Sequence, residues 1–259
     1  MAAPKLTVSG LNKSFATLLA LSDINLAISD GEFISIVGPS GCGKTTFLRI
    51  VAGLESASGG EVRIDAELVK KPGIDRGFVF QSDNLLPWRT VLANALIGPE
   101  VSGTVNEQAR SRTLDLLKLV GLGGFEQYFP RQLSGGMRQR VNLARALAID
   151  PKVLLMDEPF AALDAQTREI MQTELTRIWE QGRKTVLFVT HQIDEAVFLS
   201  DRVFVFARRP GRIRETVTID LPRPRALVIK RTPEFVRYVD HIWRLIEEDV
   251  RESVLVDKE

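Results

Sequence analysis

The sequence has 259 residues, with 34 lysines and arginines against 33 aspartates and glutamates, so its formal net charge is only +1. A charge this close to neutral argues against a nucleic-acid partner, and apolar residues at 44% are typical of a globular protein. The single cysteine, Cys42, excludes an internal disulfide and favours a reducing compartment. The first ten residues lack the basic and apolar blocks of a signal peptide, and no apolar run approaches the roughly 18 residues that cross a bilayer. We therefore expect any role at a membrane to depend on a partner.

Short strands with one solvent-exposed face are predicted within residues 1–30. Ile24, Leu26 and Ile28 alternate with polar neighbours, which is the period of a half-buried strand. Residues 61–65 repeat this alternation after the turn signal SGG. These segments predict an antiparallel β part near the N-terminus.

Four later segments are short and almost continuously apolar: FISIVG, GFVFQ, VLLMDE and TVLFVTH. Such runs are typical of parallel strands that are covered on both faces. They run into Gly38, Gln81, Asp157 with Glu158, and His191, respectively. Ligands of open parallel sheets bind beyond the carboxyl ends of the strands, so these ends predict one site assembled from four distant segments. The alternative is that each polar residue merely marks the exit of a strand.

A phosphate-binding loop is predicted after the first of these strands. GPSGCGKT fits G-x-x-x-x-G-K-[ST], and TFLRIVAGL can begin the helix that this motif requires. Backbone N–H groups would surround phosphate oxygens, Lys44 would supply a charge to the β- and γ-phosphates, and the Thr45 hydroxyl would bind Mg²⁺. The sequence therefore predicts a nucleotide with Mg²⁺ as the ligand; the resemblance described below implies that the nucleotide is ATP. The predicted nucleotide-binding residues of the loop are Gly38, Pro39, Ser40, Gly41, Cys42, Gly43, Lys44, Thr45 and Thr46.

The acidic end of VLLMDEP predicts the chemistry of the site. Asp157 can hold Mg²⁺, and Glu158 can orient and deprotonate an attacking water. Gln81, at another strand end, can bind the water or the metal. The alternatives are, for Glu158, an acid that only supports a neighbouring ligand or lies at the surface and, for Gln81, an ordinary loop amide.

The block between these two strands has a helical pattern. Thr104 and Glu107 have the spacing of a capping box, and Gly121 is a natural helix stop. A second helix follows LSGG, and Ser134 can cap its N-terminus. The apolar face of this second helix would consist of Met137, Val141, Ala144 and Ala148. We predict a helical lobe at residues 89–151, inserted into an α/β nucleotide-binding core of residues 1–88 and 152–207.

The remaining part, residues 208–259, is predicted to contain a basic strand segment and an amphipathic helix. Residues 208–231 hold eight lysines and arginines and two acids. They would form a solvated face or contact an anionic lipid or a partner. The residues predicted on the packed side of the helix are Phe235, Val239, Ile242, Trp243 and Ile246.

The ordered set GPSGCGKT, Gln81, LSGGMRQR, VLLMDEP, AALD and His191 resembles the ATP-binding subunits of ABC transporters, over about residues 5–205. The resemblance implies an α/β fold: a P-loop NTPase (RecA-like) core with a mostly parallel sheet, an antiparallel β subdomain and an inserted α-helical lobe. It also implies an ATPase that works as a homodimer. Ser134, Gly135 and Gly136 of one copy would then face the ATP held by the phosphate loop of the second copy, which supplies the lysine that LSGG lacks. The alternative for Ser134 is an ordinary helix cap.

The resemblance assigns three further residues. Phe15 stands where the family has an aromatic side chain stacked on adenine, although a core phenylalanine is the alternative. Asp164, in AALD, would link the two sites across the dimer. His191 would contact the γ-phosphate and help to position Glu158 and the water.

Two longer segments, FQSDNLLPWRTV and HQIDEAVFLSDRVFVFARRPGRI, resemble the nitrate/sulfonate/taurine import branch of the family. In the family the region Leu85, Leu86, Pro87 and Trp88 lines the groove that receives a coupling helix of the membrane subunit, whereas the alternative is packing within the lobe itself. The implied partners are a second copy, two membrane-spanning permease subunits and, indirectly, an extracytoplasmic solute-binding protein. The implied location is the cytoplasmic face of the inner membrane.

The resemblance therefore predicts a subunit that hydrolyses ATP to energise import of a small anionic solute. The alternative is a soluble ABC ATPase that acts on nucleic acid or ribosomes. Such proteins commonly carry two ATPase units or a long coiled coil, whereas this sequence has one set of motifs and no heptad run. No nucleic-acid partner is expected. A regulatory switch without turnover is disfavoured by Glu158 and His191.

Overall fold

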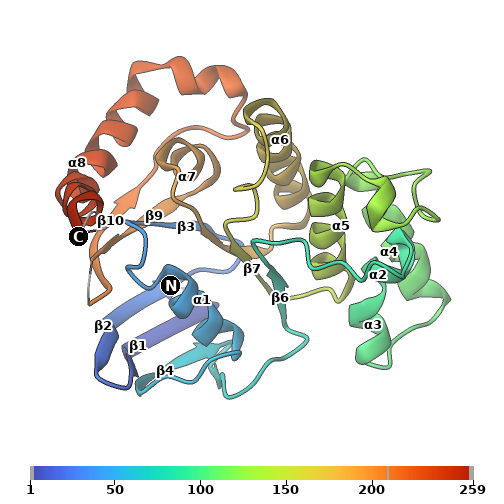
Figure 1. Cartoon of the computed structure of the whole chain (residues 1–259), viewed down its shortest axis with the longest axis horizontal. Coiled ribbons are helices and arrows are strands. Elements are labelled where there is room, and N and C mark those ends of the chain that lie inside the picture. The colour runs from blue at the N-terminus through green and yellow to red at the C-terminus, as the bar shows by residue number, and fades with distance from the viewer. Residues whose placement is uncertain (1–2, 209, 257–259) are drawn as a thin grey trace. The chain divides into compact units, whose positions relative to one another are not determined.

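The structure is a computed structural model that describes residues 3–208 and 210–256, with side chains as far as residue 251. The chain divides into two compact units (Figure 1). Unit 1 consists of Met1–Pro72 with Arg183–Glu259, and unit 2 consists of Gly73–Gly182. The predicted lobe at residues 89–151 falls inside unit 2. No helix in the described ranges is long and apolar enough to cross a membrane.

An antiparallel sheet forms the first half of unit 1. Its strand order is β2-β1-β4-β5. Leu6 pairs with Ile28 on one side and with Ile64 on the other, and all three side chains are buried. The predicted half-buried strands are therefore confirmed. The strands are β1 (Leu6–Phe15), β2 (Leu18–Ile28), β4 (Gly59–Ile64) and β5 (Glu67–Leu68).

Unit 1 also contains parallel strands, with β3 (Phe33–Val37) between β8 (Thr185–Val189) and β9 (Arg202–Ala207). Every residue of β3 and β8 is buried, as their continuous apolar runs predict. The edge strand β10 (Arg212–Thr218) runs antiparallel to β9. Helix α1 (Lys44–Ala52) follows β3, and α7 (Ile193–Leu199) follows β8.

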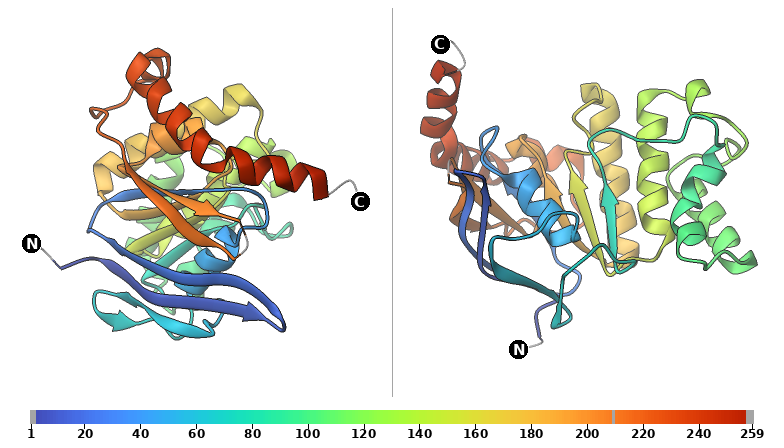
Figure 2. Two further views of the ribbon diagram at one scale, coloured as in Figure 1. Left: turned by 90° about the vertical axis from the view of Figure 1, so that its left-hand side faces the viewer. Right: turned by 60° about the horizontal axis from the view of Figure 1, so that its bottom comes forward.

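The chain of unit 1 ends in the short helix η2 (Leu227–Arg231) and the long helix α8 (Pro233–Val256). Helix α8 packs along α7, β9 and β10 (Figure 2). Phe235, Ile242 and Ile246 are buried as predicted, and Val239 is half-buried. Trp243 was expected on the same side, but this expectation is wrong because 44% of the side chain is exposed. At 100° per residue Trp243 lies roughly 60° beyond Ile246, at the edge of the packed face.

Unit 2 pairs two parallel strands with a group of helices. Strands β6 (Arg76–Val79) and β7 (Val153–Asp157) are neighbours, and every residue of β7 is buried. The helices on the N-terminal side of α5 (Gly135–Ala148) in the chain pack on it, and Figure 1 shows this group at its right-hand side. The helices of unit 2 are α2 (Val91–Ala95), α3 (Ile97–Val101), α4 (Glu107–Leu119), η1 (Pro130–Gln132), α5 (Gly135–Ala148) and α6 (Ala165–Gly182).

The helix ends in unit 2 correct one prediction and confirm another. Asn106, not Thr104, caps α4, because its side chain accepts a hydrogen bond from the Ala109 N–H at 2.7 Å. Thr104 Oγ1 instead donates to the Pro99 carbonyl at 3.4 Å. Gly121 follows the end of α4 with a φ of 72°, as a helix stop requires. On α5 the predicted apolar face is confirmed, with Val141, Ala144 and Ala148 buried and Met137 half-buried.

Candidate functional site

The loop between β3 and α1 is held in a conformation that requires glycine. Gly38, Gly41 and Gly43 have φ angles of 157°, 73° and 96°. A Cβ atom on Gly38 would lie 2.6 Å from the Phe206 carbonyl oxygen, and one on Gly43 would lie 2.7 Å from a methyl carbon of Leu21. The backbone therefore needs glycine both for conformation and for space at these positions.

The loop suits a phosphate group. Gly43 has no side chain that could cap the first amide groups of α1, so an anion can accept hydrogen bonds from them. The Lys44 ammonium donates to the Gly38 carbonyl at 2.7 Å and to the Pro39 carbonyl at 3.0 Å, which holds the charge inside the loop. Burial raises the pKa of the Cys42 thiol, so Cys42 stays neutral and adds no negative charge there.

The side chain of Phe15 lies at the end of β1 and is 44% exposed, so the core alternative is wrong. The Lys13 ammonium lies 4.6 Å from the centre of its ring and 2.7 Å from a Glu55 carboxylate oxygen. An exposed ring can stack on a base, and the adenine contact remains a prediction.

His191 follows directly after Thr190 at the end of β8, and its side chain is exposed. Thr190 is buried and donates its hydroxyl hydrogen to the Glu195 carboxylate. The same hydroxyl accepts from the Gln192 N–H at 3.0 Å. The backbone on both sides of His191 is therefore fixed by internal hydrogen bonds.

In unit 2 the structure brings Gln81 and Glu158 together. Gln81 Nε2 donates to Glu158 Oε2 at 3.4 Å, and its contact with water or a metal stays a prediction. Asp157, the last residue of β7, is buried, and Glu158 is half-buried with a φ of 45°. A non-glycine residue in this left-handed region is strained, and strain of this kind is concentrated at functional sites. The half-burial and the backbone conformation of Glu158 are compatible with a catalytic role, which stays a prediction.

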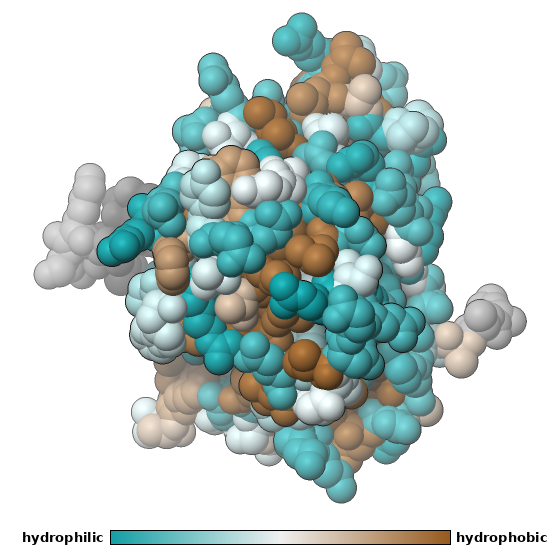
Figure 3. Space-filling view, turned by 90° about the vertical axis from the view of Figure 1, so that its right-hand side faces the viewer, coloured by the Kyte–Doolittle hydropathy of each residue, from teal (hydrophilic) through white to brown (hydrophobic). Residues whose placement is uncertain are grey.

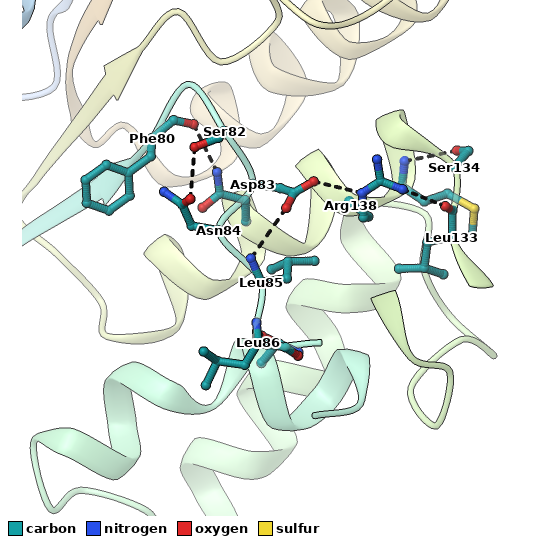
Figure 4. Close-up of polar contacts among 12 residues, drawn as sticks. Phe80, Ser82, Asp83, Asn84, Leu85, Leu86, Leu133, Ser134 and Arg138 are labelled. Carbon is teal, nitrogen blue, oxygen red and sulfur yellow. Dashed lines mark hydrogen bonds and ion pairs between the residues drawn. The ribbon is translucent and has the colours of Figure 1, made fainter. Parts of the chain in front are cut away.

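The LSGG segment lies at the N-terminus of α5 (Figure 4). Ser134 caps the helix, because its Oγ accepts a hydrogen bond from the Met137 N–H at 3.2 Å. The side chain is exposed, and a hydroxyl that accepts through its oxygen can still donate its hydrogen. The cap and the predicted anion contact are therefore compatible.

The turn before α6 touches this segment. Asp164 accepts hydrogen bonds from the Thr167 N–H at 2.9 Å and from its hydroxyl at 2.7 Å. These bonds hold the pKa of the exposed Asp164 carboxyl below its usual range. A Cβ on Gly136 would lie 2.8 Å from the Thr167 methyl carbon, so Gly136 allows the Asp164 turn to approach α5.

The structure contains a polar network between α5 and the loop after β6 that the sequence analysis did not predict. Arg138 pairs with Asp83 at 2.8 Å and donates to the Leu133 carbonyl at 2.9 Å (Figure 4). Asn142 donates to the Phe80 carbonyl at 3.2 Å, and Arg145 donates to the Asp83 carbonyl at 2.9 Å. Helix α5 thus holds the loop that contains Gln81. The sequence places these three polar residues at i, i+4 and i+7 on one face of α5, next to the apolar face, but it does not indicate what they contact.

The predicted partner groove contains an exposed aromatic side chain. Trp88 is 71% exposed, which excludes packing of this residue within the lobe, and Leu85 and Leu86 are half-buried. The buried Asn94 side chain accepts from the Leu86 N–H at 2.7 Å and donates to the Leu86 carbonyl, so the backbone beside Trp88 is rigid. The face drawn in Figure 3 has hydrophobic areas set among hydrophilic ones.

The predicted site residues are divided between the two units. Within the described residues there is no group of three His, Cys, Asp or Glu side chains that could hold a metal ion. Of the predicted Mg²⁺ ligands, Thr45 lies in unit 1 and Gln81 and Asp157 lie in unit 2, and their binding of the ion stays a prediction. Unit 1 contains Phe15, the loop Gly38–Thr46 and His191, and unit 2 contains Gln81, Ser134, Gly135, Gly136, Asp157, Glu158 and Asp164.

Comparison with known proteins gives a consistent result. The family model described as "ABC transporter" matches residues 21–161. An uncharacterized ABC transporter ATP-binding protein of Methanocaldococcus jannaschii is 52% identical over 96% of this chain and 94% of its own. The nitrate import ATP-binding protein NrtD of Synechocystis sp. is 45% identical over 93% of this chain and 94% of its own. The taurine import ATP-binding protein TauB of Yersinia pseudotuberculosis is 45% identical over 92% of this chain and 95% of its own.

Among solved structures, the chain is similar to a dimeric ATP-binding cassette in a post-hydrolysis state bound to ADP and phosphate. The two are 35% identical, with a TM-score of 0.73 over 84% of this chain and 100% of that chain. The expected α/β fold of a P-loop NTPase is therefore confirmed.

Proposed function

Since this chain belongs to the ABC transporter family and lies in its nitrate and taurine import branch, we propose that it hydrolyses ATP to energise import of a small anionic solute. The observation that carries the proposal is the likeness to the nitrate and taurine import subunits, each of which matches more than nine tenths of the chain. The exposed Trp88 on a rigid loop supports it, because a permease needs such a contact surface.

The phosphate loop binds the nucleotide in this proposal. Bound Mg²⁺ would neutralise charge on the phosphates, with Thr45, Gln81 and Asp157 as its protein ligands. Lys44 supplies a fixed positive charge to the phosphates, and Phe15 presents its exposed ring to adenine.

Glu158 is the general base and accepts a proton from the attacking water. Gln81, which donates to Glu158, orients the carboxylate. His191 donates a hydrogen bond to the terminal phosphate. A base placed in this way contributes about 10²–10⁴-fold to the rate.

A second copy completes each site. Two chains related by a two-fold axis would place Ser134 and Gly136 of one copy against the terminal phosphate held by the other. Because these contacts form only on closure, ATP favours the closed dimer, and loss of the phosphate releases it. Asp164, next to Gly136, would connect the two sites.

The closing motion would pull on two permease subunits at the cytoplasmic face of the membrane. The loop from Gln81 to Trp88 joins the catalytic amide to the exposed tryptophan, so it can carry that motion. An extracytoplasmic binding protein would deliver the solute. Nitrate, taurine and other small sulfonates are the first solutes to examine.

The test is to isolate the tagged chain from detergent-solubilised membranes of its own host and identify what accompanies it. We expect a polytopic membrane protein, and we expect the W88A variant to recover much less of it while hydrolysing ATP normally in isolation. Recovery of ribosomes or nucleic acid in its place would contradict the proposal and support a soluble ABC ATPase.

A further inference from the structure

The segment between β10 and α8, residues 219–231, contains three basic residues that are not free in solvent. Arg225 is only 4% exposed, and the side chains of Arg223 and Lys230 are 14% and 15% exposed. The interpretation of this basic stretch as a solvated face is therefore wrong for these residues. All three side chains contact helix α7 or the residue that follows it.

Arg225 binds the C-terminal end of α7. Its Nη1 donates to the carbonyl oxygens of Val197, Phe198 and Ser200 at 3.0, 3.0 and 2.7 Å. The last carbonyls of a helix need donors from outside the helix, and a guanidinium with its fixed fork supplies several at once. Burial lowers the pKa of Arg225 to about 10, which still leaves it charged at neutral pH.

The same guanidinium also binds its own segment. Nη2 of Arg225 donates to the carbonyl oxygens of Ile219 and Leu221 at 3.3 and 3.2 Å. Arg225 therefore joins the chain that leaves β10 to the end of α7. A buried cation that is hydrogen-bonded on both sides is costly to move, because each broken bond would leave a buried polar group unsatisfied.

Two further contacts hold α7. Arg223 Nη2 donates to the Leu199 carbonyl at 2.6 Å, and its Nε lies 2.9 Å from the Asp201 carboxylate. Near the other end of the helix, the Lys230 ammonium lies 3.5 Å from the Asp194 carboxylate and 5.1 Å from the centre of the Phe198 ring. Both ends of α7 are thus tied to the segment 219–231.

Helix α7 in turn determines the backbone around His191. The buried Glu195, in its first turn, accepts the hydroxyl hydrogen of Thr190. The Gln192 N–H donates to that hydroxyl at 3.0 Å, and the Gln192 carbonyl accepts from Ala196 at 3.2 Å. A shift of α7 would therefore move both neighbours of His191.

From these contacts we propose that residues 219–231 act as a clamp on α7 and that Arg225 is a positioning residue for His191. The clamp keeps the imidazole at the place where it can donate to the terminal phosphate. The effect of the clamp on catalysis rests on the proposed function. Its effect on the position of His191 does not, because that position can be measured without ATP. It gives the basic stretch a function inside its own subunit.

The first test compares the kinetics of three arginine variants. R225M should lower kcat about 10- to 100-fold with little change in ATP affinity, because a small misplacement of a catalytic group costs that much. R225K should recover part of the loss. R214M is the matched control: Arg214 is in the same basic stretch but pairs with Asp249 of α8 at 3.0 Å, so wild-type kcat is expected.

The second test asks whether Arg225 acts through His191. In an H191A background, R225M should lower kcat by less than about twofold, since the group that Arg225 positions is already gone. Losses that multiply in the double variant would show that Arg225 acts elsewhere and would overturn the proposal. If R225M does not fold, D194N removes the charge that attracts Lys230 to α7 and should give the same non-additive pattern at smaller size.

The third test does not depend on catalysis. The chain has two histidines, His191 and His241, so isotope-labelled histidine gives two sets of imidazole NMR signals. R225K and D194N should shift or broaden the His191 signals while R214M leaves them unchanged. Unchanged His191 signals in R225K and D194N would refute the clamp. A wild-type protein that binds no ATP would refute the proposed function, yet the NMR result would still decide the clamp.

Discussion

The two glycine-rich motifs of this protein use glycine for different reasons. In the loop at Gly38 the backbone adopts positive φ angles that other residues rarely adopt, and a buried Lys44 lies inside it. In the LSGG segment both glycines lie in the first turn of α5, and the exposed Ser134 caps that helix. The first motif is closed around its own lysine, whereas the second presents a solvent-exposed serine at a helix N-terminus.

This difference indicates that the two motifs have different functions. A loop with a strained backbone and an internal charge is already shaped for an anion, so it suits tight binding by one chain. An exposed helix N-terminus without a lysine suits a contact that forms only when a second charge partner arrives. The predictions below separate binding, assigned to the first motif, from turnover, which also needs the second.

The largest effect is expected from E158Q, which leaves both glycine motifs intact. Without a base, kcat should fall about 10²–10⁴-fold, while ATP still binds and holds a closed dimer. Steady-state turnover together with size-exclusion chromatography in ATP measures both quantities. Normal turnover would show that Glu158 is not the base.

A somewhat smaller loss of turnover is expected from S134R. The long side chain would occupy the surface where the second nucleotide docks, so kcat should fall at least about tenfold with ATP affinity unchanged. Equilibrium binding of a fluorescent ATP analogue and a phosphate-release assay measure the two parameters. A variant that hydrolyses ATP at the normal rate would rule out the composite site.

G38A should act on binding instead. The added Cβ would lie 2.6 Å from the Phe206 carbonyl oxygen in a conformation that costs alanine about 1–3 kcal/mol, so ATP affinity should fall at least about tenfold. The same binding assay measures it. Unchanged affinity would mean that the loop conformation is not what binds the phosphate.

The smallest expected effect is a difference in stability between variants of the two LSGG glycines. G136A should lower the free energy of unfolding by about 1–3 kcal/mol, because its Cβ would lie 2.8 Å from the Thr167 methyl carbon. G135A is the matched control, since its Cβ would meet only Arg138 at 3.8 Å, and no loss is expected. Chemical denaturation monitored by tryptophan fluorescence compares them, and equal stabilities would contradict the packing argument.

Much of the fold was predictable because its signals are local. Strands β3, β7 and β8 are covered on both faces, and continuous apolar runs follow from that burial. The cap of α5 was also predicted correctly, because Ser134 directly precedes the helix in the sequence and the signal is local. The cap of α4 was not, because Thr104 and Asn106 are both good capping residues and only the path of the chain decides between them.

Contacts between distant segments were not predictable. Asp83 and Arg138 are 55 residues apart, and either could have been an ordinary surface charge. The burial of Arg225 was missed because its partners are backbone carbonyls, which leave no pattern in a sequence. Trp243 was misplaced because one helical position at the edge of a face can be packed or exposed.

The central claim, that each reaction centre takes one motif from each of two chains, is tested most directly by mixing two inactive variants. K44A lacks a working phosphate loop and S134R lacks a working LSGG segment, so each homodimer should hydrolyse ATP far more slowly than the wild type. A mixed dimer would join the intact loop of one chain to the intact LSGG of the other, and we predict that mixing restores ATP hydrolysis to about a quarter of the wild-type rate. No recovery, in a mixture whose mixed dimers are seen by native mass spectrometry, would contradict the account.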